Sequence, residues 1–343
     1  MPNSTRSWVL IGSETAIAQL APLIAAHQVS QPVRIISYAG SDAISSDCLQ
    51  DCLQDCLPNS RLKDQIHNAS SILWIGPPYQ SPRTAVPGLF VTAKDGRKIP
   101  IGWLPNLPDR LPRYAQAAAA VVNRSNHNRN TRSLAFLGPR DDRSQALIQR
   151  LGQILKTPSS GYHTFQWTAD RLRQPDLQQA LSGGLGAALY VGHGFPNGWD
   201  SYGGVTFDRF KQIPTEHPIG ALLCLTCHNA SRHRVTLSFA EEWVLSGRCG
   251  AAIAATGPTR HTVNRVFAEH LCHAIQAEPD ITPTISHCLQ SPILQHLPLA
   301  RYRIIGDPEM PLLGAENAID SARAVFAPEP NAVLPPLPAG LWG

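Results

Sequence analysis

The chain has 343 residues, 43% of them hydrophobic, so it is long enough to bury one large core or two modest ones. Its 29 basic and 25 acidic residues give a net charge of +4, which is too slight to indicate a nucleic-acid partner. No apolar run approaches the roughly 18 residues of a membrane span, and Met1 to Ala16 does not read as a signal peptide, so we expect no membrane partner and a cytoplasmic location.

The first part of the chain alternates short apolar runs with helical patterns, which is typical of parallel strands joined by helices. Strands are predicted at residues 8–12, 33–37 and 71–76, helices at 16–27 and 114–122, and a hairpin through Lys94 to Arg97. The polar run Asn123 to Asn130 cannot bury a core. We therefore predict a smaller N-terminal α/β subdomain over residues 1–130.

Three of the eight cysteines, Cys48, Cys52 and Cys56, lie in a direct repeat with a period of four, which places them along one face of a helix. Apart from Cys224 and Cys227, no Cys-x-x-Cys pair occurs, and that pair has no matching second half, so the pattern does not indicate a zinc site. We expect reduced thiols, no metal and no other cofactor.

The second part of the chain continues the α/β pattern over residues 131–315. Helices are predicted at residues 143–155, 172–181, 237–245 and 263–277, the first of them capped by Asp141 or Asp142, and further strands at 133–138, 250–256 and 302–305. We expect these strands to pair in parallel, with right-handed crossovers. Residues 316–343 are predicted to form a proline-rich C-terminal tail.

Two apolar runs end in residues that can carry chemistry. One run ends in Gly192-His193-Gly194, and the other ends in Thr226-Cys227-His228. Chemistry in an open α/β sheet gathers at the carboxyl ends of parallel strands, so neighbouring strands would bring His193 and Cys227 side by side. A histidine beside a cysteine can generate the nucleophilic thiolate. The alternative is a strand-end histidine and a structural cysteine, which is commoner for either residue alone.

These strand ends resemble the caspase-like cysteine peptidases, and further segments narrow the resemblance to the gingipain-type family. Ile101-Gly102-Trp103-Leu104-Pro105 is similar to its Gly-Arg-Leu-Pro segment, with Trp103 in place of the usual arginine, and Gly306-Asp307-Pro308 follows late in the chain. The resemblance implies a caspase-like α/β sandwich with a mostly parallel central sheet flanked by helices. It also implies a cysteine endopeptidase that acts on a protein or peptide substrate.

The resemblance assigns roles to individual residues. Cys227, rather than Cys224, would be the nucleophile and His193 the catalytic acid and base, with the N–H groups of Gly194 and Cys227 holding the oxyanion. His228 ranks second as a base. The family uses a glutamate upstream of the histidine to orient its ring. Residues 143–187 contain no glutamate, which leaves Asp170, Asp176 and Asp307 as alternatives.

Trp199, Thr226, Thr256, Gly257 and Pro258 are predicted to contact the substrate. Metacaspases carry an aspartate two residues before the cysteine, where this chain has Leu225, so a basic cleavage-site residue is less favoured. Arg260 could instead pair with an acidic side chain, and acidic, small apolar and basic preferences all stay open.

Two other functions fit the same residues. One is a catalytically inactive scaffold or regulatory binding protein, and the other is an acyltransferase that uses the same thiol. Because a protease inside a cell must be restrained, we also expect a regulatory protein partner, a processing cleavage, or a ligand that orders residues 195–204.

Overall fold

The computed structural model describes residues 6–38, 66, 68–93, 95–124, 132–156, 161–211, 215, 217–277 and 281–324. The repeat of Cys48, Cys52 and Cys56 lies outside these residues, as does the chain beyond residue 324. Residues 318–324, which the sequence assigned to the tail, form a short helix, α15 (Ala318–Ala324).

Eleven of the described strands form one sheet with the order β2-β1-β3-β5-β14-β13-β12-β8-β6-β7, and β4 is paired to β5 at one side. Both predicted halves of the chain therefore contribute to a single sheet. The strands are β1 (Ser7–Ser13), β2 (Val33–Tyr38), β3 (Ala69–Gly76), β4 (Phe90–Thr92), β5 (Lys98–Pro105), β6 (Ser133–Gly138), β7 (His163–Thr168), β8 (Ala187–Val191), β12 (Ile219–Leu225), β13 (Cys249–Ala255) and β14 (Tyr302–Gly306).

The direction of the strands reverses once along the sheet. Neighbouring strands from β2 to β14 and from β13 to β7 are parallel, whereas β14 runs antiparallel to β13, and the short β4 beside this order runs antiparallel to β5. The expectation of parallel pairing for the last strand is therefore wrong on its β13 side. Because Ala255 pairs with Tyr302, β14 begins at the edge where β13 ends. The amino end of β14 thus lies beside the carboxyl ends of β8, β12 and β13.

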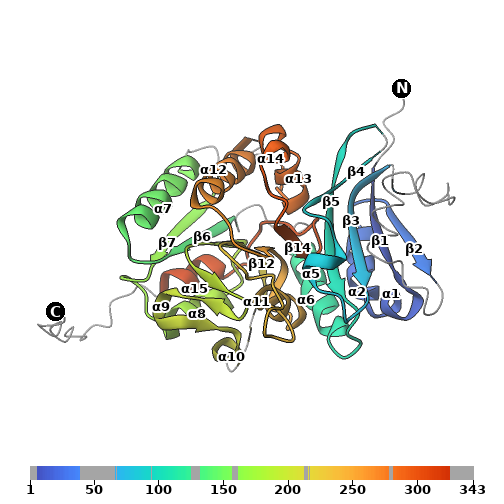
Figure 1. Cartoon of the computed structure of the whole chain (residues 1–343), viewed down its shortest axis with the longest axis horizontal. Helices are drawn as coiled ribbons and strands as arrows, with labels where there is room; N and C mark the ends of the chain where they lie inside the picture. The colour runs from blue at the N-terminus through green and yellow to red at the C-terminus, as the bar shows by residue number, and fades with distance from the viewer. Residues whose placement is uncertain are drawn as a thin grey trace, which may run out of the picture.

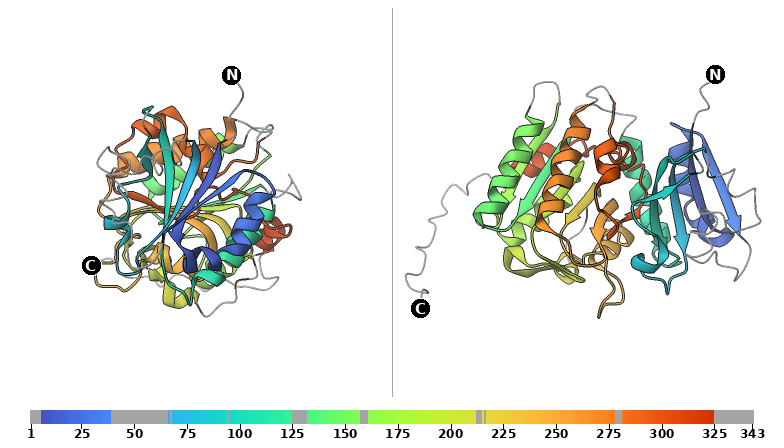
Figure 2. Two further views of the ribbon diagram at one scale, coloured as in Figure 1. Left: turned by 90° about the vertical axis from the view of Figure 1, so that its right-hand side faces the viewer. Right: turned by 45° about the horizontal axis from the view of Figure 1, so that its top comes forward.

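Helices cover the sheet, as Figures 1 and 2 show. α7 packs on α12 over one part of the sheet, and α2, α6 and α11 pack together elsewhere. The helices are α1 (Glu14–Gln19), α2 (Ala21–Gln28), α5 (Pro82–Ala85), α6 (Leu111–Arg124), α7 (Asp142–Leu155), α8 (Gln174–Ser182), α9 (Ser201–Gly204), α10 (Phe207–Phe210), α11 (Phe239–Leu245), α12 (His261–Ala277), α13 (Ile285–Leu289) and α14 (Pro292–His296). The mostly parallel α/β sheet flanked by helices, predicted from the sequence, is confirmed.

Local sequence explains where several elements begin. Asp141 caps α7 by accepting a hydrogen bond from the Ser144 N–H, as predicted. Ser238 and Glu241 form a capping box at the start of α11. The single helix expected over residues 16–27 is two helices, because α2 restarts after Leu20 with proline in its first turn.

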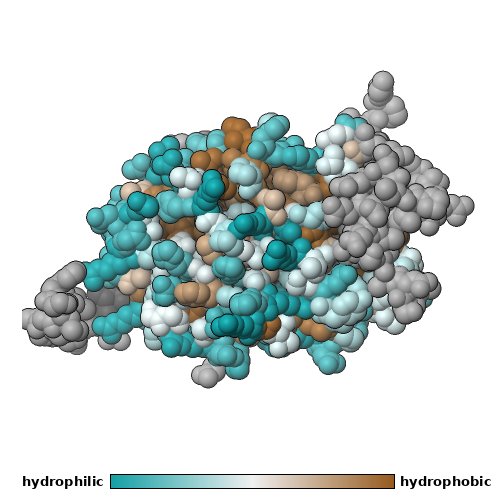
Figure 3. Space-filling model, viewed as in Figure 1, coloured by the Kyte–Doolittle hydropathy of each residue, from teal (hydrophilic) through white to brown (hydrophobic). Residues whose placement is uncertain are grey.

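The central strands are buried along their whole length, which is why they read as continuous apolar runs. The face of the molecule drawn in Figure 3 is mostly hydrophilic, with smaller hydrophobic areas between the polar side chains. Within the described residues, no helix has the length and hydrophobicity to cross a membrane.

Candidate active site

β8 and β12 are neighbours in the sheet and run parallel. Their register pairs Cys224 with Tyr190 and Leu225 with Val191, the last residues of the two strands. His193 and Cys227 each lie two residues beyond this last pair. The segments after β8 and β12 therefore leave the sheet at the same edge and at the same position along their strands. This is the placement that the strand-end argument predicted.

His193 leads directly into a small antiparallel sheet formed by β9 (Gly194–Phe195), β10 (Gly198–Trp199) and β11 (Val205–Thr206). The His193 carbonyl accepts hydrogen bonds from the Asp200 N–H, at 3.2 Å, and from the Tyr190 hydroxyl, at 3.0 Å. Its ring is exposed and makes no hydrogen bond within the described part of the chain. The backbone is therefore fixed while the imidazole stays accessible, and catalytic hydrogen bonds often tighten only when substrate binds.

Gly194 brings the histidine segment into contact with the cysteine segment. A Cβ atom on Gly194 would lie 2.7 Å from the Cys227 carbonyl oxygen, and closer still to the Thr226 hydroxyl. No side chain fits there without movement of one segment. Glycine at this position lets the residue after His193 touch the residue predicted as nucleophile.

The Cys227 thiol is partly exposed and is held by Thr259. The Thr259 N–H donates to the Cys227 Sγ at 3.3 Å, and the Thr259 hydroxyl lies 3.7 Å from the same sulfur. The Cys227 thiol can also donate to the Thr259 carbonyl, at 3.9 Å. Cys224, by contrast, is fully buried, and burial raises its pKa to about 12, so it stays a neutral thiol.

Thr259 is in turn held by a buried network that reaches back to the end of β12. Asn264, on α12, donates through Nδ2 to the Thr259 hydroxyl at 3.0 Å and to the Leu225 carbonyl at 2.9 Å. The Tyr302 hydroxyl donates to Asn264 Oδ1 at 2.7 Å. Because Asn264 donates to the Thr259 oxygen, the hydroxyl hydrogen of Thr259 is available to the sulfur. Sequence reasoning missed this network.

Asn229 ties the cysteine turn to the histidine segment. Its Nδ2 donates to the Phe195 and Gly198 carbonyls at 2.6 and 2.8 Å, and its Oδ1 accepts from the Trp199 indole at 3.0 Å. Asn229 is fully buried, and all three bonds go to the β9–β10 segment. A residue two positions after Cys227 thus fixes the distance between the two strand ends.

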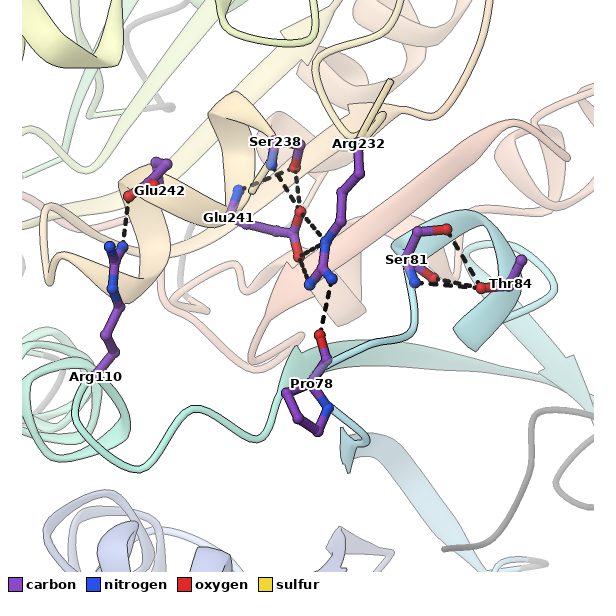
Figure 4. A network of polar contacts seen from close by, with 8 residues as sticks. All are labelled: Pro78, Ser81, Thr84, Arg110, Arg232, Ser238, Glu241 and Glu242. Carbon is purple, nitrogen blue, oxygen red and sulfur yellow. Dashed lines mark hydrogen bonds and ion pairs between the residues drawn. The ribbon is translucent and has the colours of Figure 1, made fainter. Parts of the chain in front are cut away.

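The loop after Asn229 is clamped by the buried ion pair drawn in Figure 4. Arg232 donates to the Glu241 carboxylate through Nε and Nη2, at 3.0 and 2.6 Å, and Glu241 has no exposed surface. Arg232 also donates to the Pro78 carbonyl at 2.8 Å and lies 5.6 Å from the Trp103 ring centroid. This loop is therefore anchored on the N-terminal part of the sheet, at β5 and the segment that follows β3.

A pocket of about 550 Å³ opens beside the thiol. Its lining includes Pro258, Thr259, Val263 and Tyr302, together with two arginines, Arg260 and Arg301. Thr259 both lines the pocket and contacts the Cys227 sulfur, so this one side chain and its backbone connect the pocket to the thiol. None of the described residues that line it is acidic.

The residues predicted to contact substrate take different positions. Trp199 and Thr226 are 1% and 0% exposed, so their side chains are packed in the interior and are not accessible to a substrate in this structure. Thr256 is buried and donates to the Arg301 carbonyl through its N–H and its hydroxyl. The Gly257 carbonyl accepts from the His228 N–H. Among the five, only Pro258 lines the pocket.

Asp307 does not approach His193. It lies at the carboxyl end of β14, buried with His27, whose Nε2 is 2.5 Å from its carboxylate, and it accepts from the Trp8 indole. Because β14 runs opposite to β8, that end is at the other edge of the sheet. As an alternative for orienting His193, Asp307 is wrong.

His261, the first residue of α12, lies on the same rim as His193. Partial burial lowers the pKa of His261, the positive charge of Arg143 lowers it further, Asp141 raises it, and Arg265 and His193 also lower it. These effects together favour the neutral form of His261. Asp141, the cap of α7, is a carboxylate on this rim that the sequence argument considered only as a helix cap.

A large, mostly parallel sheet with a small antiparallel hairpin after one strand and a thiol after the next defines a caspase-like α/β fold. Residues 116–313 match the model of peptidase family C25, and the chain belongs to this family, a family of cysteine peptidases. The gingipain-type resemblance predicted from the sequence is thereby confirmed. No curated protein sequence matches the chain.

The fold is shared with solved structures, among them the two that follow. The chain is similar to the Arg specific cysteine proteinase gingipain R, with 12% identity and a TM-score of 0.67 over 92% of this chain and 79% of that one. It is also similar to a structure described as a protease, with 14% identity and a TM-score of 0.66 over 90% of this chain and 79% of that one. At these identities the likeness shows the fold alone.

Proposed function

We propose that the protein is a cysteine endopeptidase with Cys227 as nucleophile and His193 as acid and base. The Cys227 thiolate attacks the carbonyl carbon of the scissile peptide bond, and His193 donates a proton to the leaving amine. Water, deprotonated by His193, then hydrolyses the thioester and releases the carboxylate product with the free thiol. The observation that carries the proposal is the shared register of β8 and β12, which ends both strands at one edge.

The oxyanion of the tetrahedral intermediate would be held by the backbone N–H groups of Gly194 and Cys227. The Cys227 N–H has no acceptor among the described residues, so it is open to a substrate oxygen. Its neighbour Gly194 lies against the Cys227 carbonyl. Both donors therefore belong to the contact that joins the two strand ends.

A reactive peptide probe tests the proposal. A peptidyl acyloxymethyl ketone should alkylate Cys227 rapidly and leave the buried Cys224 unmodified, as read by peptide mass spectrometry. Buried thiols such as Cys224, whose pKa is about 12, should react only after denaturation. Release of cleaved peptides by the same preparation separates hydrolysis from acyl transfer. The proposal would be refuted if the probe labelled Cys224 in preference to Cys227. It would also be refuted if Cys227 reacted no faster in the folded protein than in the denatured protein.

Replacing Gly194 by alanine should lower the rate of Cys227 acylation by roughly 10²-fold, because a shift of about 1 Å in a reacting group costs that much. The new Cβ would press on the Cys227 carbonyl. Gly88→Ala is the matched control, since nothing lies within 4 Å of a Cβ there. The measurement is kcat/KM for a fluorogenic peptide, and equal rates for the two variants would contradict the predicted contact.

Cytoplasmic location and a regulatory protein partner stay predictions from the sequence. Gingipain R is described as Arg specific. That preference is not part of the proposal for this chain, because the pocket beside Cys227 has two arginines and no carboxylate among its described lining residues.

A further inference from the structure

The pocket beside Cys227 is placed to receive the side chain that precedes the scissile bond. Thr259 contacts the Cys227 sulfur on one side and lines the pocket on the other. A peptide whose carbonyl carbon meets the sulfur would therefore have the adjoining side chain next to the pocket mouth. Val263 and Pro258 give the pocket apolar walls, and the Tyr302 ring lines it while the Tyr302 hydroxyl bonds Asn264.

Arg301 is fixed in position at this pocket. Its carbonyl accepts from the Thr256 N–H and hydroxyl, at 2.9 and 3.2 Å, and its Nη1 donates to the Pro258 carbonyl at 2.6 Å. These bonds attach both its backbone and its guanidinium to the segment that follows β13. The Nε and Nη2 groups have no acceptor within the described residues, so two adjacent donors stay open for a carboxylate.

Arg260 adds a second positive charge to the same pocket. Its side chain is exposed and forms no ion pair or hydrogen bond within the described part of the chain. Arginine is always protonated at neutral pH, so the pocket presents two permanent charges of one sign. A lysine or arginine side chain of a substrate would meet like charge, whereas an aspartate or glutamate side chain would be ionised and complementary.

We infer that the pocket selects substrates with an acidic residue, aspartate or glutamate, immediately before the cleaved bond. Arg301 would bind the carboxylate through its two open donors, and Arg260 would add electrostatic attraction at the rim. This inference rests on the proposed peptidase function and names its substrate class. It also assigns Thr256 and Pro258 an indirect role, because both hold Arg301 in place.

The test compares fluorogenic peptides that differ only in the residue before the cleaved bond, namely Asp, Asn, Glu, Gln, Ala, Arg and Lys. Each acid and its amide have nearly the same shape, so their ratio of kcat/KM isolates the charge. We expect the better acid to exceed its amide by roughly 10- to 100-fold, which is typical of a hydrogen bond to a charged group. Arginine and lysine peptides should be the poorest substrates.

Charge reversal gives the decisive variants. Arg301→Glu and Arg260→Glu should each lower the ratio of acid to amide and raise the relative rate for the lysine peptide. Arg323→Glu is the matched control, because the Arg323 side chain is 63% exposed on α15, which contacts the chain just before β8, at the edge of the sheet opposite to Cys227. The ratio of acid to amide for this variant should equal that of the wild type.

The possible failures are distinguishable. Wild-type protein that cleaves amides as fast as acids, or that prefers arginine or lysine, overturns the acidic preference and leaves the peptidase proposal intact. If Arg301→Glu and Arg260→Glu both leave the ratio of acid to amide unchanged, the assignment of this pocket as the specificity site is likewise overturned. If none of the seven peptides is hydrolysed and the probe fails to label Cys227, the proposed function falls and the inference falls with it.

Discussion

Replacing His193 by alanine is expected to lower kcat/KM for peptide hydrolysis by roughly 10²- to 10⁴-fold, the usual contribution of a general acid and base. The free energy of unfolding should change by no more than about 0.5 kcal/mol, because the ring is exposed and the hydrogen bonds of His193 are made by its backbone carbonyl. Steady-state kinetics and thermal unfolding of the same preparation measure both quantities. A loss of activity without loss of stability would identify a catalytic role.

His228 offers the matched control, since it is adjacent to the nucleophile and is the second candidate for the base. Its φ of 62° lies in the left-handed region, where asparagine is tolerated better than alanine. His228→Asn thus removes the imidazole with little backbone strain, and kcat/KM should fall less than 10-fold. If His228→Asn abolishes hydrolysis while His193→Ala does not, the two roles are reversed.

The sequence predicted the fold and the edge of the sheet well, because both depend on local patterns. Fully buried parallel strands read as unbroken apolar runs, so the ends of β8 and β12 could be located to within a residue or two. Their pairing follows from the preference for neighbouring parallel strands. The direction of β14 could not be predicted, since the helices between β13 and β14 permit either orientation.

The supports of the site were not predictable from local sequence. Thr259, Asn264 and Tyr302 reach the Cys227 turn from segments about 30 to 80 residues away, and only the fold brings them together. Asn229 and Trp199 bond each other across 30 residues for the same reason. Spacing therefore identifies residues at strand ends, whereas the side chains that hold them in place emerge only from tertiary packing.

The ion pair between Arg232 and Glu241 gives the second large prediction. Arg232→Ala should destabilise the protein by about 3–5 kcal/mol, because it leaves the Glu241 carboxylate buried without its positive partner. The cation over the Trp103 ring and the bond to the Pro78 carbonyl are lost as well. Urea unfolding followed by circular dichroism measures the change in free energy of unfolding.

Arg110→Ala is the control, because Arg110 pairs with Glu242, the next residue on the same helix (Figure 4). That pair is partly exposed, with the Arg110 side chain 42% accessible, so its removal should cost at most about 1 kcal/mol. Under conditions where both variants are folded, Arg232→Ala should also slow probe labelling of Cys227, since the clamped loop starts just after the nucleophile. Equal destabilisation by the two substitutions would show that burial of Glu241 does not determine the strength of the clamp.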